Sequence, residues 1–108
     1  MISGYRCMWL IAMFDLPVDT KSARKAYTHF RKSLLKDGFT MLQYSVYTRH
    51  CASKENAAVH HKRIERALPN DGEVRVLSIT DKQFERMQVF WGKKRKKPEP
   101  PPVQLELF

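Results

Sequence analysis

The chain has 108 residues, enough for one domain with a single core and too few for two. Its 20 lysine and arginine residues against 11 aspartate and glutamate residues give a net charge of +9, so a polyanion is the expected partner. No apolar run approaches the roughly 20 residues of a membrane helix, so we expect no membrane segment. Cys7 and Cys51, the two cysteines of the sequence, lack zinc-site spacing, which favours a reduced, cytoplasmic protein.

The first predicted element is a strand over residues 7–14. This run is apolar without alternation, which is typical of a strand that is central in its sheet or covered on both faces. Asp15-Leu-Pro ends the strand, and Asp19 or Thr20 can cap a helix that continues to about Asp37, before Gly38. The apolar face of this helix would be formed by Ala23, Tyr27, Phe30 and Leu34.

The middle of the chain predicts two strands, a helix and a further strand. Residues Phe39–Leu42 and Tyr44–Arg49 are short extended segments that favour neighbouring strands. Ser53 caps a second helix to Leu68, and a Pro-Asn-Asp-Gly turn leads to a strand over Glu73–Ile79. The buried stripe of the second helix would consist of Ala57, His61, Ile64 and Leu68, which leaves His60 in solvent.

The order strand, helix, strand, strand, helix, strand predicts an α+β fold of the ferredoxin-like kind. In this plan an antiparallel sheet carries both helices on one face. The other face is then left for a partner or a ligand. At this size a homodimer is an open possibility.

The end of the chain is predicted to be an extension of the domain. Thr80-Asp81-Lys82-Gln83 has the spacing of a capping box, and residues 86–91 fit either a strand or a helix, with a strand favoured. The domain would therefore cover 1–91. Residues 92–108 form a basic, proline-rich tail whose end, Val103–Leu107, alternates like a strand that could add to a sheet edge.

The basic residues are concentrated on the first helix, which carries six lysines and arginines over Lys21–Lys36 and no acid. At helical spacing four of them form a stripe roughly 22 Å long, which suits contacts to a nucleic-acid backbone. An ordinary solvated helix face is the alternative. The candidate backbone contacts are Lys21, Arg24, Lys25, Lys32, Lys36 and, on a later strand, Arg49, next to Tyr47, which could stack on a base or be core.

Asp15 is the candidate metal ligand because it follows an apolar strand and would emerge at the rim of the sheet. Two copies meeting near a dimer axis could share a hard cation such as Mg²⁺, which would assist phosphodiester cleavage. A turn or a backbone hydrogen bond is the commoner role of a lone Asp-x-Pro. Nothing in the sequence pairs another acid with Asp15, and the adjacent His60-His61 is not a metal pair.

Four segments together resemble the second CRISPR-associated protein family, the small partner of the CRISPR integrase. They are the strand ending Phe14-Asp15, the helix ending Lys36–Phe39, Gln43–Tyr47 and Ile79–Gln83. The resemblance covers about residues 7–91. The C-terminal Gln-Leu-Glu-Leu-Phe looks most like members from type II systems.

The resemblance implies a ferredoxin-like homodimer whose last strands cross to the partner, acting with the CRISPR integrase in spacer acquisition. It also implies an Mg²⁺-dependent endonuclease on RNA or DNA, with Asp15 as catalytic and metal-binding residue. Phe14 replaces the tyrosine often found before that aspartate, and Arg24 falls near a family arginine. The alternative functions are a non-catalytic scaffold that holds prespacer DNA, a toxin-like ribonuclease of the same fold, and a ribosomal or membrane-associated basic protein.

Overall fold

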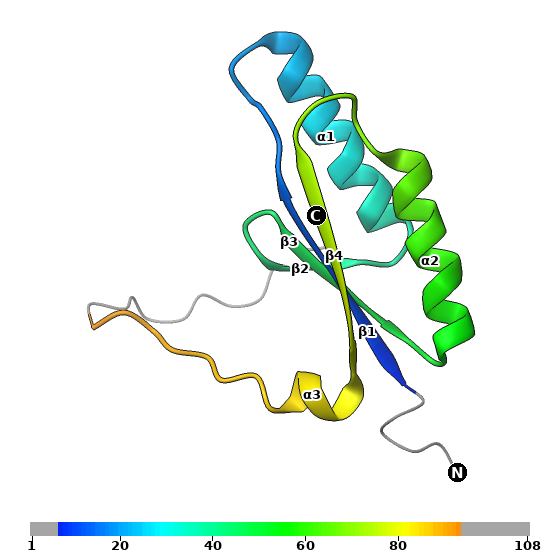
Figure 1. Cartoon of the computed structure of the whole chain (residues 1–108). Coiled ribbons are helices and arrows are strands. Elements are labelled where there is room, and N and C mark those ends of the chain that lie inside the picture. Colours follow the sequence, from blue (N-terminus) through cyan, green and yellow to red (C-terminus); the bar gives the residue numbers. More distant parts are fainter. Residues whose placement is uncertain (1–6, 94–108) are drawn as a thin grey trace.

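A computed structural model describes residues 7–93 of the chain (Figure 1). The predicted tail over 92–108 lies outside the described residues except for Gly92 and Lys93, and so does its terminal strand. No helix in the described part is long and apolar enough to cross a membrane. The elements in chain order are β1 (Met8–Asp15), α1 (Lys21–Lys36), β2 (Thr40–Gln43), β3 (Val46–Cys51), α2 (Lys54–Ala67), β4 (Glu73–Thr80) and α3 (Asp81–Glu85).

The four strands form one antiparallel sheet in the order β2-β3-β1-β4, which confirms the predicted ferredoxin-like plan. β1 is central, as its unbroken apolar run predicts. Met8 pairs with Cys51 on one side and with Thr80 on the other. Figure 1 shows α1 and α2 side by side on the same face of this sheet.

The core lies between the helices and alternate residues of β1. Met8, Leu10, Ala12 and Phe14 project from β1 into a cluster with Phe30 and Leu34 of α1 and Ala57 and Ile64 of α2. Leu10 is 1% exposed and Phe30 is fully buried. Since side chains alternate along a strand, the opposite face of the sheet, away from α1 and α2, receives the other β1 side chains: Trp9, Ile11, Met13 and Asp15.

α3 packs against the face of the sheet opposite α1 and α2, at the start of β1. Thr80 forms the predicted capping box with Gln83. The ring of Phe84 stacks on Trp9 with centroids 3.9 Å apart, and the Trp9 indole donates a 2.7 Å hydrogen bond to Asp81. This short helix therefore covers the end of the face that lies farthest from Asp15.

Residues 86–91 do not form the predicted strand. After α3 the chain leaves the sheet, and Val89 and Phe90 are strongly exposed (Figure 1). The alternating pattern supplies suitable side chains, but a strand also needs a neighbouring edge to bond its backbone. β2 and β4 are the outer strands of the sheet, and within the described residues the segment 86–91 pairs with neither of them.

The predicted phase of α2 is wrong by one residue at its centre. His60 is buried and His61 is exposed, and Leu68 lies outside the helix and is half exposed. The buried stripe follows Ala57, His60 and Ile64, at spacings of three and four. His61 instead approaches Glu65 in solvent at 3.4 Å.

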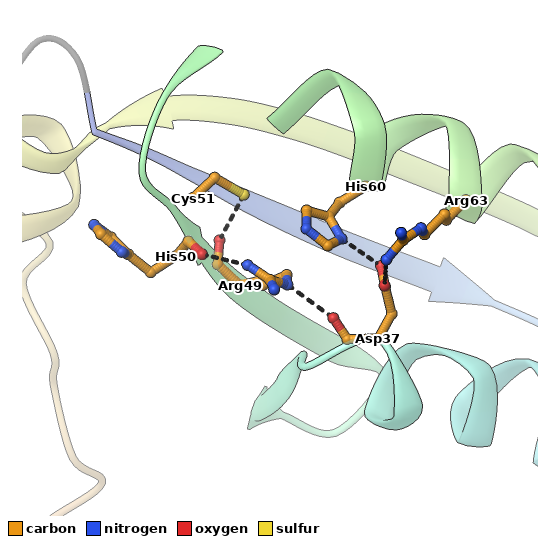
Figure 2. A network of polar contacts seen from close by, with 6 residues as sticks. All are labelled: Asp37, Arg49, His50, Cys51, His60 and Arg63. Carbon is orange, nitrogen blue, oxygen red and sulfur yellow. Dashed lines mark hydrogen bonds and ion pairs between the residues drawn. The ribbon is translucent and has the colours of Figure 1, made fainter. Parts of the chain in front are cut away.

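His60 is buried because Asp37 provides a partner (Figure 2). Asp37 follows the last residue of α1, and its carboxylate contacts His60 Nδ1 at 2.7 Å and Arg63 Nη1 at 2.6 Å, both from α2. Burial opposes ionisation of this carboxyl, yet the hydrogen bonds from His60 and Arg63 hold its pKa below the usual range. The network joins the end of α1 to the middle of α2.

Candidate metal and nucleic-acid site

Asp15 is the last residue of β1 and is exposed on the face of the sheet opposite α1 and α2. The next residue, Leu16, is buried and fixes the chain as it leaves the sheet. Gly72, just before β4, has a φ of +95° and packs so tightly here that a Cβ would lie 2.8 Å from the backbone oxygen of Asp15. Asp15 therefore stands at the rim of the sheet, as predicted, on a closely packed backbone.

The structure places Glu73 directly opposite Asp15 in the pairing of β1 with β4. Residues opposite each other in an antiparallel pair point to the same face with Cβ atoms about 5 Å apart. Sequence reasoning missed Glu73 because the two residues are far apart in the chain and only the strand register brings them together. Glu73 also accepts a 2.9 Å hydrogen bond from Arg75 on the same strand.

Carboxylate oxygens are the ligands that Mg²⁺ prefers, and it commonly binds through one or two of them with water and phosphate. Asp15 and Glu73 fit that donor set. Among residues 7–93 there is no group of three or more histidine, cysteine, aspartate or glutamate side chains that could hold a metal alone. Asp15 and Glu73 are therefore two carboxylates that this chain would offer to a metal, and further ligands would have to come from elsewhere.

An open hollow of about 210 Å³ lies beside Asp15. The turn between β2 and β3 forms its other rim. The residues that line it are Met13, Phe14, Asp15, Tyr44, Ser45, Val46, Glu73 and Arg75. The hollow thus joins the two carboxylates to an apolar floor and an aromatic ring.

The predicted lysine stripe is exposed along α1, on the side away from the buried residues Phe30 and Leu34. It consists of Lys21, Lys25, Lys32 and Lys36. Because α1 covers one face of the sheet and Asp15 lies on the other, the structure does not bring the stripe and the carboxylates onto one surface. Arg24 is also exposed, and it donates a 3.1 Å hydrogen bond to the backbone oxygen of Val18.

Arg49, the last of the predicted contacts, is engaged within the protein. Its Nε donates to the backbone oxygen of Asp37 at 2.8 Å, and its Nη1 donates to the backbone oxygen of His50 at 2.7 Å (Figure 2). Tyr47 is buried and belongs to the core. These bonds give Arg49 a structural task, fastening the end of α1 to β3.

Comparison with known proteins gives one consistent answer. Residues 8–87 match the family described as CRISPR associated protein Cas2. The chain is 64% identical to "CRISPR-associated endoribonuclease Cas2" of Parvibaculum lavamentivorans, over 94% of this chain and 100% of that one. It is 51% identical to the protein of the same name from Flavobacterium psychrophilum, over 99% and 93%.

A solved structure titled "Crystal structure of cas2" has the same fold. It superposes with a TM-score of 0.55, at 21% identity, over 87% of this chain and 99% of that one. The fold predicted from the order of elements is therefore also that of a known structure.

Proposed function

Because the chain belongs to the Cas2 family, we propose that it is an endonuclease of CRISPR adaptation that works as a homodimer with the CRISPR integrase. The relatives' name supports cleavage of RNA, and DNA is the alternative substrate. The observation that carries the proposal is the position of Asp15, exposed at the end of a rigid central strand with Glu73 opposite it.

Asp15 and Glu73 are the residues that would hold Mg²⁺. A bound Mg²⁺ supplies charge stabilisation and orientation of water near a scissile phosphodiester. Two Asp15 side chains, one from each subunit, would complete the site. Without a cation, carboxylates brought this close repel each other, which keeps phosphate away from the site.

The chain's own geometry contributes rigidity. The tight packing of Gly72 against Leu16 and the backbone of Asp15 limits movement of the backbone at the end of β1. Arg75 contacts Glu73 from the same strand at 2.9 Å, in an exposed ion pair that orients the second carboxylate only weakly. Pre-oriented groups lower the cost of reaching the reactive geometry.

The test is cleavage of labelled single-stranded RNA and duplex DNA with Mg²⁺ and with EDTA. Asp15→Asn should reduce metal-dependent cutting at least a hundredfold, whereas Asp19→Asn, which removes another exposed carboxylate, should cut like the wild type. Both variants are first compared with the wild type by light scattering to confirm the same oligomeric state. Equal cutting by all three proteins would reject Asp15 as the catalytic residue.

A second candidate function is a scaffold that holds prespacer DNA without cutting it. The exposed lysine stripe favours it, because the stripe lies on the helix layer, away from the carboxylates, and needs no catalysis to bind a backbone. Binding of duplex DNA with no cutting under any metal condition would select this function.

A further inference from the structure

Tyr44 is a large aromatic residue that is 78% exposed. It lies in the turn between β2 and β3, at the rim of the hollow beside Asp15. An exposed tyrosine can be an accident of the surface. Three contacts indicate instead that this ring is held in place.

The turn that carries Tyr44 is fixed from both sides. Ser45 has a φ of 61°, a left-handed conformation that few residues other than glycine adopt, and its backbone oxygen accepts a 3.0 Å hydrogen bond from the N–H of Phe14. The Ser45 hydroxyl is 2.9 Å from the Tyr27 hydroxyl. A strained backbone that the surroundings maintain is a common feature of binding sites.

Tyr27 also supports the ring of Tyr44 from behind. The two rings are stacked with centroids 6.3 Å apart and an angle of 23° between their planes. Burial raises the pKa of the Tyr27 phenol further above neutral pH, and its hydroxyl shares a hydrogen bond with Ser45. The turn that carries Tyr44 is therefore fixed, and one face of its ring is supported by Tyr27.

The chemistry of the hollow favours a flat, uncharged group. Met13 and Val46 are half-buried and form an apolar floor, and the carboxylates of Asp15 and Glu73 lie on the same hollow with the guanidinium of Arg75, which is paired with Glu73. Since Arg75 compensates Glu73, the remaining charge of Asp15 would repel a phosphate here unless a further cation intervened. A nucleobase is flat, apolar on its faces and uncharged, and it gains from stacking on an aromatic ring.

We propose that Tyr44 is a stacking platform for one unpaired nucleobase, which positions the neighbouring backbone beside Asp15. In a duplex both faces of an internal base are already covered by its neighbours, so the platform selects single-stranded nucleic acid. This inference rests on the proposed function for its biological use, but the binding itself requires no cleavage.

The experiment measures binding of a labelled single-stranded RNA and a duplex of the same sequence by fluorescence anisotropy in EDTA, where no cutting occurs. Tyr44→Ala should weaken single-strand binding about tenfold and leave duplex binding unchanged, and Tyr44→Phe should restore it. Met41→Ala removes an exposed apolar side chain from β2 outside the hollow and serves as the matched control. Thermal unfolding confirms that each variant is folded.

A second series replaces one nucleotide at a time by an abasic site. At the position that stacks, the abasic RNA should bind the wild type about tenfold more weakly and should lose nothing further with Tyr44→Ala. Equal losses for single strand and duplex, or no loss, would overturn the platform. So would dissociation of the dimer by Tyr44→Ala, because it would assign the ring to a subunit contact.

The two proposals can fail separately. If Asp15→Asn cuts like the wild type while Tyr44→Ala loses single-strand affinity, the endonuclease assignment fails and the platform stands. If Asp15→Asn abolishes cutting and Tyr44→Ala binds normally, the platform fails alone.

Discussion

Replacing Asp37 with asparagine tests how the end of α1 is fastened to α2. The Asp37 side chain is 13% exposed, and its two partners differ sharply, since His60 is 5% exposed and Arg63 is 55% exposed. A hydrogen bond to a buried charged group contributes about 1.5–3 kcal/mol to stability. An ion pair to an exposed arginine contributes about 0–1 kcal/mol.

Asp37→Asn is therefore expected to lower the free energy of unfolding by about 2–3 kcal/mol, nearly all of it from the bond to His60. The melting temperature should fall by about 8–24 °C, at about 4–8 °C per kcal/mol for a domain of this size. Arg63→Ala is the matched control and should cost less than about 1 kcal/mol.

The assay is urea unfolding followed by circular dichroism, with all proteins at one concentration because a dimer's stability depends on it. An Arg63→Ala loss as large as that of Asp37→Asn would refute the reasoning, since the exposed pair would then equal the buried one. A loss below about 0.5 kcal/mol for Asp37→Asn would refute it as well.

The same network predicts a pH dependence. The pKa of Asp37 is lower in the folded protein than its ordinary value near 3.8. The unfolded chain therefore binds this proton more readily, so the stabilisation is complete above the unfolded pKa and is lost as pH falls through the folded one. The stability difference between wild type and Asp37→Asn should shrink below about pH 4.

Two further predictions concern the strand end and the helix stripe. Gly72→Ala should lower the free energy of unfolding by about 2–4 kcal/mol and reduce cutting, because the new Cβ would lie 2.6 Å from Leu16 and 2.8 Å from the Asp15 oxygen at a positive φ. Unfolding and cleavage assays check this. Gly92→Ala, where a Cβ meets nothing within 4 Å, is the control and should change neither. If four stripe lysines contact duplex DNA, the logarithm of the binding constant should fall with the logarithm of the salt concentration with a slope of about −3.6. Replacing both Lys32 and Lys36 with glutamine should halve this slope in a salt titration. An unchanged slope would make the stripe an ordinary solvated face.

The fold was predictable because each element has a local signal. The apolar run of β1, the Thr20 cap of α1 and the capping box at Thr80 all act within a few residues, and the structure confirms each. The strand order then follows from the small number of ways in which such elements can pack.

The errors have a different origin, since each depends on a contact between distant segments. His60 is buried because Asp37, 23 residues earlier, accepts its hydrogen bond, and no helical pattern shows this. Glu73 joins Asp15 only through the strand register. The hydrogen bond from Arg49 to the backbone of Asp37 is likewise a contact between distant segments, and the predicted nucleic-acid contact of Arg49 stays a prediction.

Residues 86–91 show a further limit. Their alternation is sufficient for a strand, yet in the described part of the chain they pair with neither outer strand of the sheet. Sequence pattern specifies which face of a strand is apolar, but the backbone partner is a separate requirement.

The central position of β1 has a consequence for synthesis of the protein. β1 leaves the ribosome before both of its neighbours, β3 and β4, which end at Cys51 and Thr80. At a translation rate of about 5–20 residues per second, the 65 residues from 16 to 80 take about 3–13 s to emerge. For that time β1, the most apolar strand, has at least one edge without a hydrogen-bonded neighbour. During that time the nascent chain carries an exposed apolar strand edge, an aggregation hazard that the finished fold removes by pairing β1 on both sides.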